Sequence, residues 1–440
     1  MRKRGAPLAI REVIAKKRDG SELSPAEIRE AVDGCVLGRV ADSQMAALLM
    51  AIVLRGMTAR ETADLTFAMV ASGECLDLSS VPGTKVDKHS TGGVGDKTTL
   101  VVAPLVASLG VPVPKMSGRA LGHTGGTIDK LECIPGLTTA LSPDRFRRQV
   151  AEIGVAIAAQ TDRMVPADKK IYALRDATAT VESVPLIASS VMSKKLAAGA
   201  DAIVLDVKAG TGAFMPDVQS ARALAEAMVD IGRRGGKRVL ALVTRMDEPL
   251  GAAVGDGPEL VEAAQTLAGQ GPPDFIELCE IVAGHMLHLG GAARDPEEGR
   301  ERAGRGLASG AGLAKLREMV VAQGGRPDIV DQPETLIDRA ERIPVEAERD
   351  AYVAGIDARR IGVLVRDLKA RAGERKSECG VLLHKKTGDA VGGEPVATVL
   401  VPQEMRDLGM QAAADVRRAF AMAERAPERP GILAAVVAPH

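Results

Sequence analysis

Apolar residues recur every three or four positions along the first 73 residues, a spacing typical of helices with one buried face. Ser24 with Glu27, and Thr58 with Glu61, match the capping box that begins a helix. Residues 43–54 carry more apolar side chains than so small a domain needs for its own core, and such a face also fits a contact with a second copy of the chain. These side chains are Met45, Leu48, Leu49, Ile52 and Val53.

Serine, proline and glycine interrupt the helical period at residues 74–83, which we interpret as a hinge. Beyond the hinge, short runs rich in β-branched residues alternate with helical segments, a pattern typical of an α/β domain. The predicted strands include residues 85–87, 112–114, 202–207 and 238–243.

Two later segments change character. Residues 166–198 return to helical composition and predict a second segment of the helical domain. Within the last hundred residues, 380–391 resemble a strand, a tight turn and a strand. The predicted class is α/β, with a small all-α domain of two chain segments and a large mixed α/β domain that ends in an α+β part. The segments are 1–73 and 166–198 for the helical domain, 74–83 for the hinge, 84–160 and 201–335 for the α/β domain, and 340–440 for the α+β part.

Composition narrows the class of protein. The 440 residues allow two or three domains, and 57 Lys and Arg balance 58 Asp and Glu. Aromatic residues make up 2% of the chain and tryptophan is absent, so we expect no nucleic-acid partner. The uncharged residues 98–114 contain two prolines and are too short to cross a membrane, and no secretory signal is visible.

The five cysteines are odd in number, widely spaced and never arranged as Cys-x-x-Cys, which predicts reduced thiols and a cytoplasmic location. They are Cys35, Cys75, Cys133, Cys279 and Cys379. His285 and His288 lie three residues apart without a third ligand nearby in the sequence, so we assign no zinc site.

The first of three glycine-rich segments, residues 86–99, follows a predicted strand and begins a predicted helix. Glycine lets backbone N–H groups approach an anion, and the side chains of Lys88, Ser90 and Thr99 are further donors. The segment matches neither a Walker motif nor Gly-x-Gly-x-x-Gly, because Asp96 and Thr98 occupy required positions. A phosphate site and a purely structural turn therefore both remain open for this segment alone.

The second glycine-rich segment, residues 115–132, adds Lys115, Ser117 and Thr127 as donors. Two such loops, each after a strand, can surround one anion, which favours phosphate. Arg119 and Asp129, in the same segment, are typical of a structural ion pair that stabilises the loop.

His123, in the same segment, is as typical of a hydrogen bond to the backbone as of a ligand contact. The third segment, residues 206–216, ends another strand. Phe214 there fits either an aromatic ligand or simple packing, and Asp206 with Lys208 fits a structural pair.

Residues 88–96 and 117–132 resemble the signature of the thymidine phosphorylase and pyrimidine-nucleoside phosphorylase family. The similarity continues through residues 172–176, 185–195, 210–216 and 248–251, so it covers nearly the whole chain. It implies a helical domain built from two chain stretches, a larger α/β domain with a C-terminal α+β part, and a homodimer formed through the helical domains.

The resemblance also implies roles for individual residues. Phosphate would be bound by Lys88, Ser90, Gly92, Thr99, Lys115, Ser117 and Thr127. The pyrimidine would be bound by Arg175, Ser190 and Lys194, with Leu121, Tyr172, Ile187 and Phe214 lining the pocket. His89, Arg175 and Lys194 would be catalytic, although Arg175 next to Asp176 is also typical of a local ion pair.

The implied activity is reversible phosphorolysis of thymidine, deoxyuridine and uridine to the free base and α-D-(deoxy)ribose 1-phosphate. Inorganic phosphate would be the co-substrate, and no organic cofactor is expected. Alternatives are an enzyme restricted to thymidine, a nucleoside monophosphate phosphorylase, a hydrolase and a non-catalytic nucleoside-binding protein.

Two positions depart from the family or divide it. Members of the broad pyrimidine type can bind a monovalent cation, such as potassium, at positions that correspond to Gly95, Leu250, Ala253 and Glu262. Lys97 stands here where a hydroxyl ligand is expected, and its ammonium would replace that cation. Broad-specificity members resemble this chain in having lysine at position 115, whereas thymidine-restricted members have methionine, so we predict that uridine is accepted.

Overall fold

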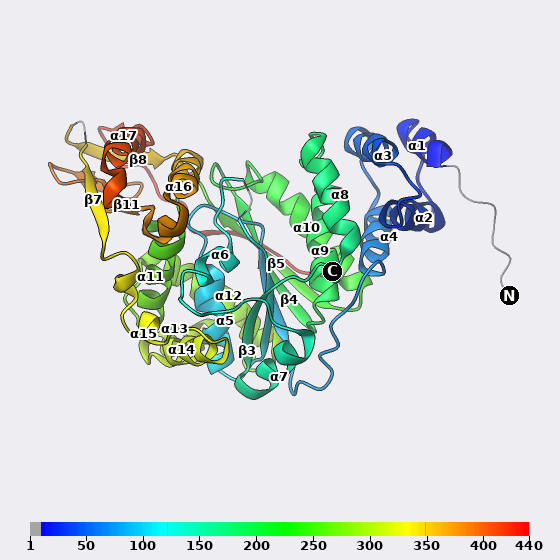
Figure 1. Ribbon diagram of the computed structural model, residues 1–440, viewed down its shortest axis with the longest axis horizontal. Coiled ribbons are helices and arrows are strands. Elements are labelled where there is room, and N and C mark those ends of the chain that lie inside the picture. The colour runs from blue at the N-terminus through cyan, green and yellow to red at the C-terminus, as the bar shows by residue number, and fades with distance from the viewer. Residues whose placement is uncertain (1–9, 121, 348, 440) are drawn as a thin grey trace.

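A helical domain forms one end of the molecule (Figure 1). In this computed structural model, which describes residues 10–120, 122–347 and 349–439, it contains both predicted chain segments. Residues 1–9 of the predicted first segment lie outside the described residues. Both predicted capping boxes are present, at α2 and α4. The helices are α1 (Ile10–Arg18), α2 (Pro25–Val36), α3 (Asp42–Arg55), α4 (Ala59–Val70), α8 (Pro166–Ala177) and α9 (Val184–Ala197).

The apolar face of α3 lies inside this domain. Met45, Leu48, Leu49 and Ile52 are buried in the same cluster as residues of α2, α4 and α8. They therefore cannot also contact a second copy of the chain. The large apolar side chains that this domain exposes among its described residues are Leu37, Met50 and Leu54, which are 64%, 38% and 74% exposed.

The central sheet has the strand order β1-β4-β5-β13. Its first three strands are parallel, as predicted for an α/β domain, whereas β13 pairs with β5 in the antiparallel direction. A separate parallel pair, β2 and β3, lies beside it, and β3 had not been predicted. The strands are β1 (Val86–Ser90), β2 (Val113–Ser117), β3 (Val155–Ala159), β4 (Ala202–Ala209), β5 (Arg238–Arg245) and β13 (Leu433–Val437).

Helices cover both faces of the central sheet. Val204 of β4 packs in the cluster of α5 and α12, whereas Ile203 and Leu205 pack with α9 and α10, because neighbouring side chains of a strand point to opposite faces. The helices of this domain are α5 (Thr98–Ser108), α6 (Thr127–Leu131), α7 (Pro143–Ile153), α10 (Val218–Arg234), α11 (Asp256–Leu267), α12 (Pro273–Leu289), α13 (Pro296–Ala308), α14 (Ala311–Ala322) and α15 (Asp328–Asp331).

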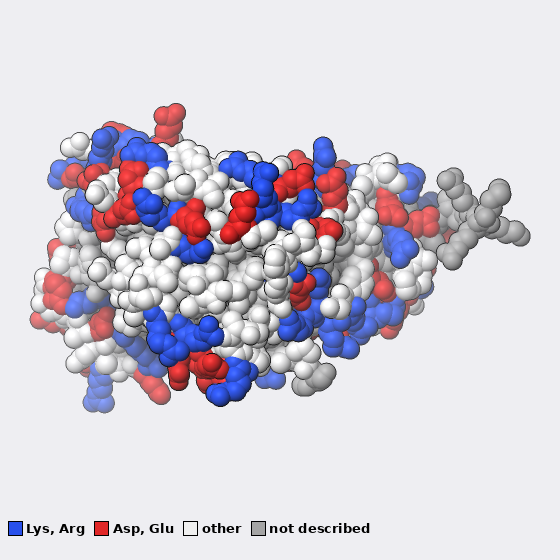
Figure 2. Space-filling model, turned by 90° about the horizontal axis from the view of Figure 1, so that it is seen from below, with Lys and Arg blue, Asp and Glu red and all other residues white. Residues whose placement is uncertain are grey.

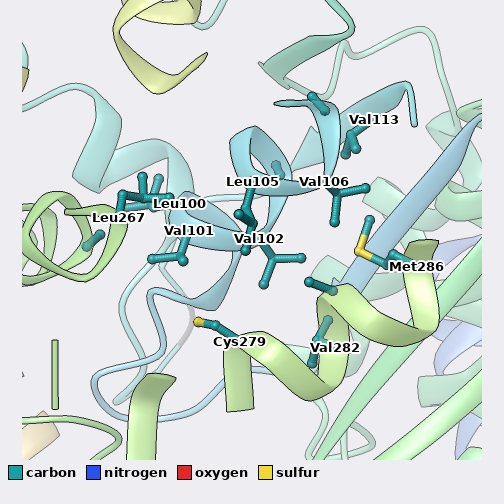
Figure 3. Packing of buried hydrophobic residues seen from close by; sticks show 14 of the residues in the cluster. Leu100, Val101, Val102, Leu105, Val106, Val113, Leu267, Cys279, Val282 and Met286 are labelled. Carbon is teal, nitrogen blue, oxygen red and sulfur yellow. The ribbon is translucent and has the colours of Figure 1, made fainter. Parts of the chain in front are cut away.

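Helix α5 is buried on all sides (Figure 3). Leu100, Val101 and Leu105 lie among residues of α11 and α12, including Leu267 and Val282. The uncharged stretch at residues 98–114 is thus a core helix that leads into β2. In the described part of the chain, no helix combines the length and the apolar character that a membrane span needs.

The C-terminal part, as we name residues 340–432, lies at the end of the molecule opposite the helical domain (Figure 1). It contains strands of two small sheets, with the orders β6-β9-β11-β7 and β10-β8-β12. Its helices are α16 (Ala358–Ala372) and α17 (Arg406–Arg417). The strands are β6 (Ala253–Val254), β7 (Ala340–Val345), β8 (Ala351–Ile356), β9 (Gly380–Leu383), β10 (Ala390–Val391), β11 (Ala397–Pro402) and β12 (Phe420–Ala423).

Three expectations about this region need correction. Residues 380–391 form the predicted strand, turn and strand, but the two strands do not make a hairpin, because β9 pairs with β6 and β11 while β10 pairs with β8. Strand β6 belongs in sequence to the α/β segment but completes a C-terminal sheet. The last strand, β13, returns to the central sheet, so the α+β part does not extend to residue 440. In each case the pairing partner is distant in sequence, where local patterns give no information about it.

Charged side chains of both signs are interspersed on the face seen in Figure 2. This mixture agrees with the near-zero net charge of the sequence. It leaves no extended single-sign surface on that face for a nucleic-acid backbone.

One buried ion pair joins the helical domain to the sheet. Lys195 of α9 donates from Nζ to Asp87 Oδ2 of β1 at 2.8 Å and to the Met116 carbonyl of β2 at 2.9 Å. Both charged side chains are almost fully buried. Asp87 also accepts the backbone N–H of Lys88 at 2.7 Å. The pair therefore aligns the helix that carries Lys194 and Lys195 with the strand that continues to Lys88 and His89.

We expect Lys195→Met to lower the free energy of unfolding by about 3 kcal/mol, because the buried Asp87 carboxylate loses its hydrogen-bonded cation and keeps only Lys115, at 3.9 Å. Unfolding in urea measures this loss. The double variant Asp87→Asn/Lys195→Met removes the isolated charge and should recover part of the stability. A Lys195→Met single variant as stable as the parent chain would contradict a linking role for the pair.

Candidate functional site

A cavity of about 270 Å³ lies where β1 and β2 end and α8 and α9 pass over them. Its wall includes nearly all the residues predicted from the sequence to bind phosphate or pyrimidine. Lys88 lies behind this wall, and Leu121 is outside the described residues. The predicted residues in the wall are His89, Ser90, Gly92, Thr99, Lys115, Ser117, Thr127, Tyr172, Arg175, Ile187, Ser190, Lys194 and Phe214.

The first glycine loop is organised by Asp96. Its carboxylate accepts the Ser90 hydroxyl, and also the backbone N–H and the hydroxyl of Thr98 at 3.1 and 2.8 Å. The Ser90 oxygen in turn accepts the N–H of Gly92 at 3.1 Å. Gly92 has φ +93°, and a Cβ there would lie 3.4 Å from both Phe214 and Thr124. Asp96, which prevents a match to the Walker motif, thus fixes the conformation of this loop.

The second loop places Lys115, Ser117 and Thr127 on the opposite side of the cavity. Arg119, which also reaches the cavity, forms the expected structural pair with Asp129 at 3.1 Å and a further pair with Glu132 at 2.7 Å. These pairs connect the loop to the following helix and use the charge of Arg119.

Arg175 is buried on the helical side of the cavity. It donates from Nε to the Thr180 carbonyl at 3.2 Å, and from its two NH groups to the carbonyls of Leu186 at 3.1 Å and Val181 at 2.6 Å. Its guanidinium carbon lies 5.7 Å from the Tyr172 ring centre. These contacts go to carbonyls and not to Asp176. Since a guanidinium has five N–H groups, it still has donors for a ligand.

Lys194 is oriented by a residue that the sequence analysis missed. Its Nζ donates to Asp168 Oδ2 at 2.6 Å and to Ser190 Oγ at 3.1 Å. Asp168 is buried, and its second oxygen has no hydrogen-bond partner among the described residues. Asp168 and Lys194 are 26 residues apart on different helices, so no local pattern indicated the pair.

His89 is enclosed by cations. Burial lowers its pKa well below the ordinary value, and Lys195, Lys115, Lys194 and Lys88 lower it further. The imidazole is therefore neutral. Its Nε2 is buried without a hydrogen-bond partner among the described residues.

Lys115 shares the Asp87 carboxylate with Lys195. Its Nζ lies 3.9 Å from Asp87 Oδ1 and donates to the Met116 carbonyl at 3.1 Å. Burial lowers the pKa of Lys115 well below its ordinary value, and the Lys195 charge adds to this effect more than Asp87 opposes it. An anion beside Lys115 would favour its protonated form.

Behind the wall, Lys88 and Lys208 converge on Asp206. Lys208 Nζ lies 2.8 Å and Lys88 Nζ 3.3 Å from Asp206 Oδ2, so Asp206 and Lys208 form the expected structural pair. All three side chains are buried. Neither ammonium has a well-aligned hydrogen bond within the part of the chain that the structure describes.

Positive charge exceeds negative charge around the cavity. In the described wall and directly behind it, six cationic side chains face four carboxylates, leaving aside Arg119, which is paired elsewhere. The cations are Lys88, Lys115, Lys194, Lys195, Lys208 and Arg175, and the carboxylates are Asp87, Asp96, Asp168 and Asp206. When all six are protonated, the excess of two positive charges equals the charge of one phosphate dianion.

Phe214 of the third loop lies at the cavity wall. Its ring centre is 5.6 Å from that of His123, whose Nε2 lies 3.3 Å from the Gly212 carbonyl oxygen in the third loop and not against the backbone of its own loop. The second and third loops therefore touch each other.

Three of the four residues expected around a monovalent cation, Leu250, Ala253 and Glu262, converge on the Lys97 ammonium. Its Nζ donates to the carbonyls of Leu250 at 2.7 Å and Ala253 at 3.0 Å and pairs with Glu262. The Lys97 side chain is fully buried and lies over the Phe275 ring, with Nζ 5.1 Å from the ring centre. These oxygens already surround an ammonium, so the residues present do not fit an additional potassium ion.

The helical and α/β segments match two parts of one known family. Residues 11–73 match "Glycosyl transferase family, helical bundle domain", and residues 82–313 match "Glycosyl transferase family, a/b domain". The chain therefore belongs to this glycosyl transferase family.

The chain is 50% identical over 401 residues to a pyrimidine-nucleoside phosphorylase of Geobacillus stearothermophilus, a match that covers 90% of this chain and 93% of the relative. It is 49% identical, with the same coverage, to the pyrimidine-nucleoside phosphorylase of Bacillus subtilis. These matches confirm the family and fold class predicted from the motifs. An anthranilate phosphoribosyltransferase from Thermus thermophilus shares the fold, with a TM-score of 0.57 and 22% identity over 70% of this chain and 98% of that chain.

We expect Lys97→Met to lower the free energy of unfolding by about 3–5 kcal/mol, because Glu262 would remain buried without a cation. Lys97→Thr opens room for a free ion, so its unfolding temperature should be higher in potassium than in sodium chloride. The parent chain should unfold at the same temperature in both salts. A parent chain that potassium stabilises over sodium would contradict this assignment.

Proposed function

We propose that this chain catalyses the reversible phosphorolysis of thymidine, deoxyuridine and uridine. The products are the free base and α-D-(deoxy)ribose 1-phosphate. The observation that carries the proposal is the excess of positive charge, most of it buried, around a cavity whose other side can receive a ring. The names of relatives about 50% identical over most of the chain support the same activity.

Phosphate would lie between the first two glycine loops. Ser90, Thr99, Ser117 and Thr127 bring hydroxyl donors to the cavity wall, and Lys115 adds charge. Lys88 would contribute charge from behind the wall, at 3.3 Å from Asp206. Charge-assisted hydrogen bonds to an anion are stronger than neutral ones, so this set favours phosphate over a neutral ligand.

The pyrimidine would lie against the helical domain. Arg175, Ser190 and Lys194 face it with polar groups, whereas Tyr172 and Ile187 offer apolar surface. The Asp168 and Ser190 contacts hold the Lys194 ammonium in one place before the base arrives. Such preorganised donors stabilise charge that develops in a transition state.

In the proposed reaction, a phosphate oxygen attacks C1′ from the face opposite the base. The new C1′–O bond forms as the C1′–N1 bond breaks, and the bonding electron pair leaves with the pyrimidine. The sugar passes through a state with oxocarbenium character. Arg175 and Lys194 stabilise the negative charge on the leaving base. Closure of the helical domain onto the α/β domain would align the two substrates and exclude water.

His89 would act as a hydrogen-bond donor to the O2 atom of the base. Its lowered pKa keeps the imidazole neutral, so the ring offers an N–H group and no full positive charge. A neutral donor strengthens its bond as O2 becomes negative. This step needs no proton stored on His89 before the reaction begins.

Assembly and location complete the proposal. The homodimer would use the exposed Leu37, Met50 and Leu54 of the helical domain, since Met45, Leu48, Leu49 and Ile52 of α3 are buried. The five cysteines are free, which supports a cytoplasmic location.

We expect the base to be released from thymidine and uridine only when phosphate is present, as measured by chromatography of the products. Release without phosphate would indicate a hydrolase, and a preference for UMP over uridine would indicate a monophosphate phosphorylase.

Lys194→Ala should lower kcat/KM about 10²- to 10³-fold, because it removes charge stabilisation at the base. Lys169→Ala is a matched control, because that exposed lysine pairs with Asp162. A Lys194→Ala variant with near-normal turnover would remove Lys194 from the site.

We expect Lys115→Met to reduce uridine cleavage more than thymidine cleavage, because thymidine-restricted members of the family have methionine at this position.

In the parent enzyme, the KM for phosphate should rise as the pH increases through the lowered pKa of Lys115, because phosphate favours the charged amine. This rise should be missing in Lys115→Met, whereas the ionisation of phosphate itself affects both proteins equally. Identical pH profiles for the two proteins would contradict the role of Lys115.

A further inference from the structure

The C-terminal part binds residues 248–251, which follow strand β5 of the central sheet. Lys386, between β9 and β10, donates from Nζ to the carbonyls of Pro249 and Gly251, the latter at 3.0 Å. The same ammonium lies 3.1 Å from Asp274 and 3.3 Å from Glu248. One side chain of the C-terminal part thus binds four groups of the α/β domain.

A neighbouring residue adds to this grip. The backbone N–H of Thr387 and its hydroxyl donate to Glu248 Oε2 at 2.9 and 2.6 Å. Residues 384–389 can reach the α/β domain because β9 and β10 belong to different sheets and are not closed into a hairpin.

Residues 248–251 contact the first glycine loop directly. The N–H of Leu250 donates to the Val94 carbonyl at 3.1 Å, and the Leu250 carbonyl accepts from Lys97 at 2.7 Å. Gly95 has φ +73°, and a Cβ there would be 2.7 Å from the Leu250 oxygen. A shift of residues 248–251 would therefore move the loop that carries Ser90 and Gly92.

A second path begins at α16. Lys369 pairs with the buried Asp256, the first residue of α11. One turn further along α11, Glu259 pairs with Lys130 at 2.8 Å, and Lys130 donates to the Asp96 carbonyl at 2.6 Å. Asp96 is the residue that organises the first glycine loop, so this path leads to the same place as the first.

Helix α16 also touches the second loop. A Cβ on Gly362 would lie 2.5 Å from the His123 carbonyl oxygen and 2.8 Å from the Val94 side chain. The absence of a side chain at this position lets the helix approach both loops. Among the described residues, none of the C-terminal part lines the cavity itself.

We propose that the C-terminal part is a clamp that positions the two phosphate loops, with Lys386 as its principal positioning residue. This inference rests on the proposed function, since it assigns the loops to phosphate. We expect the clamp to act on phosphate, because the contacts of Lys386, Lys369 and Gly362 lead to the first two glycine loops. The proposed base site lies on α8 and α9, which the Lys195 pair joins to β1 and β2 instead. The matched α/β segment ends at residue 313, so the clamp lies beyond it.

The test compares Lys386→Met with Lys385→Met in the full-length chain. Lys385 is a matched control because it is equally shielded but pairs with Glu394 inside the C-terminal part. Lys386→Met should raise the KM for phosphate about tenfold, while the KM for uridine and kcat at saturating phosphate stay within about twofold. Lys386→Arg should restore most of the phosphate affinity, and Lys385→Met should leave both KM values unchanged.

Calorimetry with inorganic phosphate provides a second readout that needs no turnover. The Kd for phosphate should rise in parallel with KM, so the clamp can be judged even if the parent chain releases no base and the proposed function fails. An unchanged Kd for phosphate in folded Lys386→Met, or an equal rise in the KM of both substrates, would overturn the clamp. Should Lys386→Met fail to fold, Thr387→Val removes one hydroxyl contact and should raise the phosphate Kd about threefold, with no rise counting against the proposal.

Discussion

The site depends on one buried carboxylate, that of Asp87. It accepts the Lys88 N–H at 2.7 Å and the Lys195 ammonium at 2.8 Å, and it lies 3.9 Å from Lys115. An unpaired charge in this position would be costly, so α9 keeps its register with β1 and β2 at Lys195, and the proposed closure of the helical domain would have to pivot about this contact. That register places the helical residues Ser190 and Lys194 opposite the glycine loops.

The same constraint explains the electrostatics of the cavity. Burial lowers the pKa of Lys115 and His89, and because one carboxylate cannot neutralise two ammonium groups, the remaining positive charge lowers both further. The protein therefore contains a charge imbalance that an anion would relieve. The ammonium of Lys97, at the edge of the first loop, creates no such imbalance, because it pairs with Glu262 and donates to two carbonyls. The cavity therefore favours a bound anion, whereas the Lys97 position does not favour a bound cation.

Local sequence patterns predicted the elements whose formation depends on near neighbours. The capping boxes of α2 and α4, the buried strands β1, β4 and β5, and the return to helix at residues 166–198 all agree with the structure. Residues 380–391 form the predicted strand, turn and strand, but the two strands do not pair with each other, and β3 was missed. Strands β6 and β13 joined unexpected sheets, because a strand finds its partner by burying and bonding with distant residues.

For the site, the sequence by itself determined which residue types the glycine loops and the α9 segment bring, and motif similarity determined the family. The tertiary structure decided which of them share a cavity, placing Lys88 behind its wall and Arg119 in ion pairs. It also added Asp168, Lys195 and Lys386, whose ion-pair partners are 26 to 138 residues away. Ion pairs over such separations leave no periodic trace in a chain, because their geometry exists only after the domains have packed.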